Sequence, residues 1–213
     1  GGILAEDLGL GKTILALTWV LHLRGQAGQN PPPSLVVCPK SVLDVWAAEV
    51  EKAAPKIRVQ VLRNRADLDM DFVAKNVDLL VINYAQLRGA ADDLLAVEWL
   101  SVILDEGQQI KNPDSKAAKS ARALNARNRL VLTGTPIENR LLDVWSLMAF
   151  SMPGILGNRK YFRDRFDRRK DSNSHTRLTA RLRPFLLRRT KGEVALDLPP
   201  KTEEDVFCKL ESK

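Results

Sequence analysis

Short apolar runs alternate with longer amphipathic segments through the first 150 residues, and this alternation constrains the fold more than any other feature. The runs are rich in β-branched residues and lie at residues 2–5, 34–38, 58–62, 78–82, 101–105 and 129–134. Segments with helical periodicity lie between or after them, at residues 13–23, 41–53, 115–124 and 140–150. Strands that are apolar throughout and separated by helices are typical of parallel sheets covered on both faces. We therefore expect an α/β fold with a mostly parallel sheet and helices on both faces.

The positive charge of the chain lies in its C-terminal part. Residues 1–150 hold 17 basic and 17 acidic side chains, whereas residues 151–213 hold 16 basic and 9 acidic ones, which accounts for the formal net charge of +7. The apolar strand pattern stops near residue 152, where basic helix-like segments take over. We expect one domain over 1–150 and a basic helical extension over 151–213. An Arg-rich surface can bind a phosphate backbone or simply face solvent, and composition favours neither interpretation.

Composition predicts a soluble, intracellular protein. The apolar fraction is 45%, and no apolar run approaches the ~20 residues of a membrane helix. No basic and apolar leader precedes the first motif, so nothing indicates export. Cys38 and Cys208 have no second thiol or histidine nearby at metal-ligand spacing, which predicts reduced structural residues. Trp46 and Trp145 occupy apolar positions of amphipathic segments, which predicts core packing for both.

A candidate phosphate-binding loop separates the first apolar run from the first helical segment. Gly9 and Gly11 allow backbone N–H groups to turn toward an anion at the positive end of the following helix. Lys12 would reach the β- and γ-phosphates of a nucleotide, and the Thr13 hydroxyl would bind Mg²⁺. The generic pattern has glycine where this chain has Glu6, so a glycine-rich turn that caps a helix is the competing interpretation. The residues expected to bind the nucleotide are Asp7, Leu8, Gly9, Leu10, Gly11, Lys12 and Thr13.

Two acidic residues, Asp105 and Glu106, follow the apolar run at 101–105. Open α/β sheets bind ligands at the carboxyl ends of their strands. Asp105 would hold Mg²⁺, and Glu106 would polarise the water that attacks the γ-phosphate. Alone, such a pair could simply cap the next turn. Together with a phosphate-binding loop earlier in the chain, the pair predicts hydrolysis of a nucleoside triphosphate.

Five motifs in one order resemble the first motor lobe of the Swi/Snf-type ATPases, the DNA-translocating branch of helicase superfamily 2. They are LAEDLGLGKT, VVCPKSVLDVWAAE, VINYAQLR, VILDEGQQIKNP and RLVLTGTPIENRLLDVWSLMAF. The segments PGILG and RPFLLRRTKGEVALDLPPK are similar to the stretch that leads out of this lobe. The resemblance covers nearly the whole chain. It implies a RecA-like P-loop domain over 1–150 and a basic extension over 151–213 that leads toward a second lobe.

The resemblance also implies roles for single residues. The family carries an acidic residue at the position of Glu6. Gln108 is implied to face the γ-phosphate and to complete a catalytic set with Lys12, Asp105 and Glu106. The motif implied to couple nucleotide state to DNA contact consists of Thr133, Gly134, Thr135 and Pro136. The residues implied to touch the phosphate backbone of one DNA strand are Pro39, Lys40, Ser41, Asn83, Tyr84 and Arg88. The competing interpretations are a core aromatic for Tyr84, a solvated loop residue for Lys40 and a turn former for Thr135.

The implied function is Mg²⁺-dependent ATP hydrolysis that drives movement along double-stranded DNA and displaces or remodels bound proteins. In such motors a second lobe supplies the arginine that stabilises the leaving phosphates, so we expect a piece of a larger motor that is weakly active or inactive alone. The implied partners are duplex DNA, that second lobe, and RNA polymerase or other DNA-bound proteins, with no membrane. The DEGQ form favours a bacterial, nucleoid-associated protein in the cytoplasm; a eukaryotic one would be nuclear.

Two alternatives to this function stay open. The first is an RNA helicase or an RNA-polymerase-associated motor of superfamily 2, because the same motifs serve those enzymes. The second is a nucleic-acid-binding fragment of such a motor that does no chemistry by itself.

Overall fold

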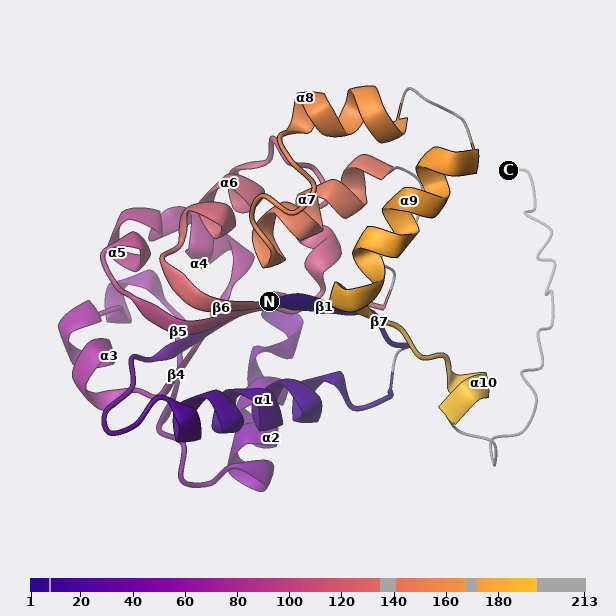
Figure 1. The fold of residues 1–213 in the computed structure, drawn as a ribbon. Helices are drawn as coiled ribbons and strands as arrows, with labels where there is room; N and C mark the ends of the chain where they lie inside the picture. The colour runs from indigo at the N-terminus through magenta and orange to yellow at the C-terminus, as the bar shows by residue number, and fades with distance from the viewer. Residues whose placement is uncertain (8, 135–140, 168–171, 195–213) are drawn as a thin grey trace, which may run out of the picture.

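A single parallel sheet forms the centre of the molecule. The computed structural model describes residues 1–7, 9–134, 141–167 and 172–194, with only the backbone for residues 167 and 172–175. Within these ranges seven strands occur in the order β3-β4-β2-β5-β6-β1-β7, and all neighbours are parallel (Figure 1). The strands are β1 (Gly2–Leu4), β2 (Ser34–Cys38), β3 (Val59–Val61), β4 (Leu79–Asn83), β5 (Trp99–Leu104), β6 (Ala126–Leu132) and β7 (Leu186–Leu187). The predicted α/β fold and all six apolar strands are confirmed.

Helices cover both faces of this sheet (Figure 1). One face carries α1 (Lys12–Gln26) and α2 (Leu43–Ala53). The other face carries α3 (Met70–Asn76), α4 (Tyr84–Gly89), α5 (Ala91–Leu95), α6 (Lys116–Ala123) and α7 (Leu141–Ser151). Three of these helices, α3, α4 and α5, were not predicted from the sequence, and they have 7, 6 and 5 residues. Segments of one or two turns are too short to show a helical period.

Alternating side chains of the central strands divide the core into two layers. Val36 and Cys38 of β2 pack with α1 and α2, whereas Leu35 and Val37 pack with the helices of the opposite face. Because both sets are fully buried, such a strand appears in the sequence as a continuous apolar run. Burial, aided by the negative charge of Asp105, raises the pKa of the Cys38 thiol to about 12, so this thiol is neutral and shielded.

The chain beyond residue 151 packs back onto the same sheet. Helices were expected in this part of the chain, but their bounds were not predicted. The structure has α8 (Arg159–Phe162), a π-helical turn at Arg163–Asp167, α9 (Ser172–Leu182) and α10 (Lys191–Val194). Phe162, Phe166 and Leu178 lie in the same core cluster as Phe150. A division at residue 150 stays a prediction, because side chains on both sides of it share this core.

The expectation that strands end before this extension is wrong. Leu186 and Leu187 form β7 and pair with Ile3 and Leu4 of β1. Two residues are too few to produce a strand pattern in the sequence. They pair here because β1 would otherwise present an edge with unpaired N–H and C=O groups. No helix in the described ranges combines the length and the apolar character that crossing a membrane requires.

Candidate nucleotide site and nucleic-acid groove

The candidate phosphate-binding loop connects β1 to α1. Gly9 and Gly11 have φ angles of 89° and 79°, a left-handed backbone that favours glycine. Gly11 is also the N-cap of α1, and no side chain caps this helix. The N–H groups of the first turn therefore remain available to an anion, and the helix dipole favours one there. Leu8 lies outside the described residues.

Lys12 places a positive charge directly at this loop. Its Nζ donates hydrogen bonds to the main-chain oxygens of Glu6, at 2.8 Å, and Asp7, at 3.1 Å. Both acceptors belong to the loop itself, so the ammonium is held beside the glycines that an anion would approach. The contact of Lys12 with nucleotide phosphates stays a prediction.

Asp105 and Glu106 lie at the carboxyl end of β5, as the sequence predicted. Trp46 Nε1 donates to Asp105 Oδ2, and the main-chain N–H of Glu106 donates to Asp105 Oδ1, both at 2.9 Å. Burial raises the pKa of Asp105, and the Trp46 bond, the Glu106 N–H and the charge of Lys12 act against it. Glu106 has a φ of 50°, which turns the chain sharply after the strand.

One cavity of about 300 Å³ joins the loop to the acidic pair. Its lining consists of Gly9, Gly11, Lys12, Thr13, Ile14, Val42, Val45, Trp46, Glu49, Asp105 and Glu106. A carboxylate and a hydroxyl are oxygen ligands that suit Mg²⁺, while backbone N–H groups and an ammonium suit phosphates. In the described part of the chain no three Cys, His, Asp or Glu side chains could hold a metal together. Mg²⁺ is usually bound by one or two carboxylates together with substrate phosphates and waters, and the Asp105 carboxylate and Thr13 hydroxyl fit an ion of that kind.

Gln108 links the acidic pair to the end of β6. Its Nε2 donates to Glu106 Oε2 at 2.7 Å, and Thr133 Oγ1 donates to Gln108 Oε1 at 3.0 Å. Thr133 is fully buried, and its N–H donates to Leu4 at the end of β1. The first residue of the motif expected to couple nucleotide state to DNA contact, Thr133, is thus connected to Glu106 by hydrogen bonds through Gln108. Gly134 is described, whereas Thr135 and Pro136 lie outside the described residues.

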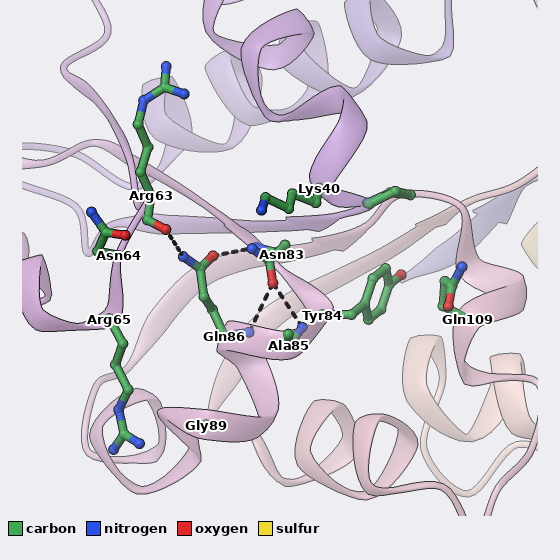
Figure 2. Close-up of a pocket in the computed structure, with 11 residues that line it drawn as sticks. Lys40, Arg63, Asn64, Arg65, Asn83, Tyr84, Ala85, Gln86, Gly89 and Gln109 are labelled. Carbon is green, nitrogen blue, oxygen red and sulfur yellow. Dashed lines mark hydrogen bonds between the residues drawn. The ribbon is translucent and has the colours of Figure 1, made fainter.

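A second hollow, which we call the basic groove, lies beside the carboxyl ends of β2 and β4 (Figure 2). It measures about 590 Å³ and is lined by Pro39, Lys40, Arg63, Asn64, Arg65, Asn83, Tyr84, Ala85, Gln86, Gly89 and Gln109. Four of the six residues predicted to touch DNA belong to this lining: Pro39, Lys40, Asn83 and Tyr84. Ser41 and Arg88 are exposed outside it.

Sequence reasoning missed two cations of the basic groove. Arg63 and Arg65 follow β3 in a stretch that matched no motif, and their side chains are 63% and 62% exposed. Arg63 pairs with Asp44 at 2.5 Å and Arg65 with Asp93 at 3.7 Å. The pairing of β3 with β4 places the segment after β3 at the groove that Lys40 also lines, and the two guanidinium groups point in opposite directions (Figure 2). The signal that could have found them is the close spacing of two arginines immediately after a strand.

Asn83 and Gln86 shape the groove from within. Asn83 Oδ1 accepts from the N–H groups of Ala85 and Gln86, and Gln86 Oε1 accepts from the Asn83 N–H, which forms a capping box at the start of α4. Gln86 Nε2 then donates to the main-chain oxygens of Leu62 and Arg63, at 2.8 and 3.1 Å (Figure 2). This network fixes the segment that carries Arg63 against α4.

The fold and its cavity define a nucleotide-binding α/β domain of the P-loop class, with a basic groove at the same edge of the sheet. The whole chain, residues 1–213, matches the family model described as the SNF2-related domain. The chain therefore belongs to this family, and it is an SNF2-family motor domain with a RecA-like fold. The predicted resemblance to the Swi/Snf-type ATPases is confirmed.

Similar proteins and a solved structure agree with this assignment. An uncharacterized ATP-dependent helicase of Mycoplasma pneumoniae is 38% identical over 216 residues, which is 99% of this chain and 20% of the relative. A putative ATP-dependent helicase/translocase of Bacillus subtilis is 37% identical over 225 residues, 100% of this chain and 24% of the relative. The chain thus spans about a fifth to a quarter of these relatives. A solved structure, the Sulfolobus solfataricus SWI2/SNF2 ATPase core in complex with dsDNA, superimposes with a TM-score of 0.82 at 38% identity, over 92% of this chain and 41% of that one.

Proposed function

We propose that this chain is the ATP-binding lobe of a motor that hydrolyses ATP to move along double-stranded DNA and to displace or remodel bound proteins. The observation that carries the proposal is the cavity that joins Lys12 and Thr13 to Asp105 and Glu106. Further support comes from the relative named as a putative helicase/translocase and from the related ATPase core solved with double-stranded DNA.

The residues of the cavity have separate tasks in this proposal. Lys12 and the free N–H groups of α1 bind the β- and γ-phosphates, since both lie at the glycine loop. Thr13 and Asp105 hold Mg²⁺, which neutralises charge on the phosphates when it is bound. Glu106 orients the attacking water and accepts its proton. Gln108 fixes the Glu106 carboxylate through the 2.7 Å bond, and its task would be to contact the γ-phosphate.

The basic groove is the proposed site for one strand of the DNA backbone. Lys40, Arg63 and Arg65 line it, and Asn64 and Gln109 add polar side chains. The two arginines form exposed ion pairs with Asp44 and Asp93, which DNA phosphates would have to replace. Contacts of this kind neutralise phosphates and hold the duplex without reading its sequence. Tyr84 contributes a wall of the groove rather than a charge, and Ser41 and Arg88 would extend the contact beyond the lining.

The complete protein is proposed to need a second lobe. That lobe would supply the arginine that stabilises the transferred phosphate, so the chain alone is expected to hydrolyse ATP weakly or not at all. RNA polymerase or other DNA-bound proteins would be the objects displaced. Such a motor acts in the bacterial cytoplasm on the nucleoid, or in the nucleus of a eukaryote.

Nucleic-acid preference separates the proposal from its alternatives. The rate of ATP hydrolysis by the complete protein should be measured with duplex DNA, single-stranded DNA and RNA at equal phosphate concentration. The proposal predicts the largest stimulation by duplex DNA. Stronger stimulation by RNA would favour an RNA helicase instead, and no hydrolysis with any of the three would favour a binding module without chemistry.

A further inference from the structure

Tyr84 belongs to the basic groove and to the nucleotide site at the same time. Its ring lines the groove, and in Figure 2 the hydroxyl points toward the side of Gln109 rather than toward Lys40. That hydroxyl donates a hydrogen bond of 2.8 Å to the main-chain oxygen of Asp105. The residue is only 7% exposed, so the bond is shielded from water. A residue at the wall of the groove therefore holds the backbone of the carboxylate that is proposed to bind Mg²⁺.

Trp46 reaches the same aspartate from the opposite layer. Its indole N–H donates to Asp105 Oδ2, and the side chain is fully buried. α2 follows directly on a helical turn, Lys40–Val42, whose first residue lines the basic groove. Val42 and Trp46 line the nucleotide cavity. One continuous helical segment thus carries a groove cation at its start and a carboxylate donor one to two turns later.

Packing of Trp46 in the core does not by itself require its hydrogen bond to the Asp105 carboxylate. Trp99 is equally buried, and its indole N–H is satisfied by a main-chain oxygen, that of Leu94, at 2.9 Å. Trp46 instead donates to a carboxylate of the proposed active site. Hydrogen bonds to charged groups are shorter and stronger than neutral ones, so a shift of the donor changes how the carboxylate is held.

We propose that Tyr84 and Trp46 are positioning residues that couple duplex binding in the basic groove to binding of the Mg²⁺–nucleotide at Asp105. The inference rests on the proposed function, because it assigns regulation to the same two sites. DNA that contacts Lys40 and the Tyr84 wall shifts the two donors together, and the donors set the backbone and the carboxylate of Asp105. Thermodynamic linkage makes the effect reciprocal: the nucleotide must strengthen DNA binding by the same factor by which DNA strengthens nucleotide binding.

The coupling factor can be measured without turnover. The dissociation constant of the Mg²⁺ complex of a non-hydrolysable ATP analogue is determined for the complete protein with and without a saturating short DNA duplex. We expect duplex DNA to tighten binding in the wild type by about fivefold or more, a typical lower value for coupled sites. Tyr84→Phe and Trp46→Phe keep the ring and lose the donor, and each should bring this factor close to one.

Trp99→Phe is the matched control, because it removes a buried indole N–H that touches neither site. It should keep the wild-type factor. If duplex DNA tightens nucleotide binding in both Tyr84→Phe and Trp46→Phe by the same factor as in the wild type, the inference is overturned and the proposed function is not affected. An equal loss in Trp99→Phe would also overturn it, since any buried donor would then have the same effect. Absence of duplex-stimulated hydrolysis in the wild type would instead overturn the proposed function. If Trp46→Phe does not fold, Tyr84→Phe alone decides.

Discussion

Arg189 forms an ion pair with Glu6, a fully buried carboxylate at the start of the phosphate-binding loop, across 183 positions of sequence. The neighbouring backbone follows the same path: the Ala5 N–H donates to Leu187 O at 2.7 Å, and the Lys191 N–H donates to Asp7 Oδ2 at 3.0 Å. The segment after β7 therefore lies along the loop. This gives a physical reason for an acidic residue where the generic loop has glycine, since Glu6 anchors that segment.

Loss of the Arg189 guanidinium should destabilise the fold measurably. In Arg189→Met the Glu6 carboxylate stays buried without its partner, which we expect to lower the free energy of unfolding by about 2–3 kcal/mol. The value lies at or below the range for fully buried pairs because the Arg189 side chain is 43% exposed. Urea denaturation measures the change. Arg127→Met is the control, because the Arg127–Glu98 pair is exposed on both sides and should contribute less than ~1 kcal/mol. Equal losses in the two variants would contradict this role of Glu6.

Gly107 is required by close packing between the acidic motif and β6. A Cβ added at this position would lie 2.3 Å from Val131 Cγ1, so the turn that carries Glu106 and Gln108 would have to move. Gly107→Ala should cost about 1–3 kcal/mol of stability and slow ATP hydrolysis by the complete protein. Val131→Ala in the same chain should restore part of the stability and part of the hydrolysis rate. Gly25→Ala, in an open position of α1, should be neutral or stabilising. No rescue by Val131→Ala would show that sterics are not the cause.

The Thr133 hydroxyl should matter for turnover and not for nucleotide affinity. Thr133→Val removes the donor to Gln108 and frees the amide that holds Glu106. One hydrogen bond of this kind corresponds to about a tenfold fall in the hydrolysis rate, with the nucleotide dissociation constant nearly unchanged. Steady-state kinetics of the complete protein, together with a binding titration, separate the two quantities. Thr18→Val removes an exposed hydroxyl of α1 and should leave both at wild-type values. A change in affinity alone would argue against the relay.

Asp78 should make stability depend on pH in the acid range. Its carboxylate lies between Arg24, at 2.5 Å, and Arg58, at 2.8 Å. Burial acts to raise the pKa of Asp78, but the hydrogen bonds from Arg58 and the charge of Arg24 outweigh it, so the pKa is lowered. A carboxylate whose pKa is lower in the folded than in the unfolded protein stabilises the fold at pH values above its unfolded pKa of about 4. This stabilisation is lost as the pH falls through the folded-state pKa.

The Asp78→Asn variant tests this linkage. We expect it to be less stable than the wild type at pH 7 by about 3 kcal/mol, because Arg24, whose side chain is only 16% exposed, is left beside a neutral group. The difference in the free energy of unfolding between the two proteins should become smaller as the pH falls below about 4. Urea midpoints recorded between neutral and acid pH measure it. A difference that stays constant over this range would show that the carboxylate charge is not the source.

The parts of the fold that sequence could predict are those with local signals. Each central strand is apolar throughout because both faces of the sheet are covered, and the loop with Lys12 follows its strand directly. β7 could not be predicted, because a strand of two residues exists only through its pairing with β1. Arg63 and Arg65 were missed for a similar reason, since their place in the groove depends on a contact between distant segments.

Two aromatic residues show why single-role predictions from sequence are incomplete. Trp46 is buried in the core as predicted, yet it also donates to Asp105. For Tyr84 the sequence left a choice between a DNA contact and a core aromatic, and the structure combines a buried ring, a place in the groove wall and a bond to Asp105. A hydrogen bond between residues far apart in sequence leaves no local pattern.

The cavity between the glycine loop and the acidic pair is proposed to bind ATP and to hydrolyse it in response to DNA. The most direct test measures ATP binding and duplex-stimulated hydrolysis by the complete protein with Lys12→Ala and Glu106→Gln. Lys12→Ala should lose nucleotide binding, because the ammonium at the loop is gone. Glu106→Gln should bind ATP like the wild type and lose turnover, because it cannot accept the proton of the attacking water. Duplex-stimulated hydrolysis at the wild-type rate in either variant would contradict the account.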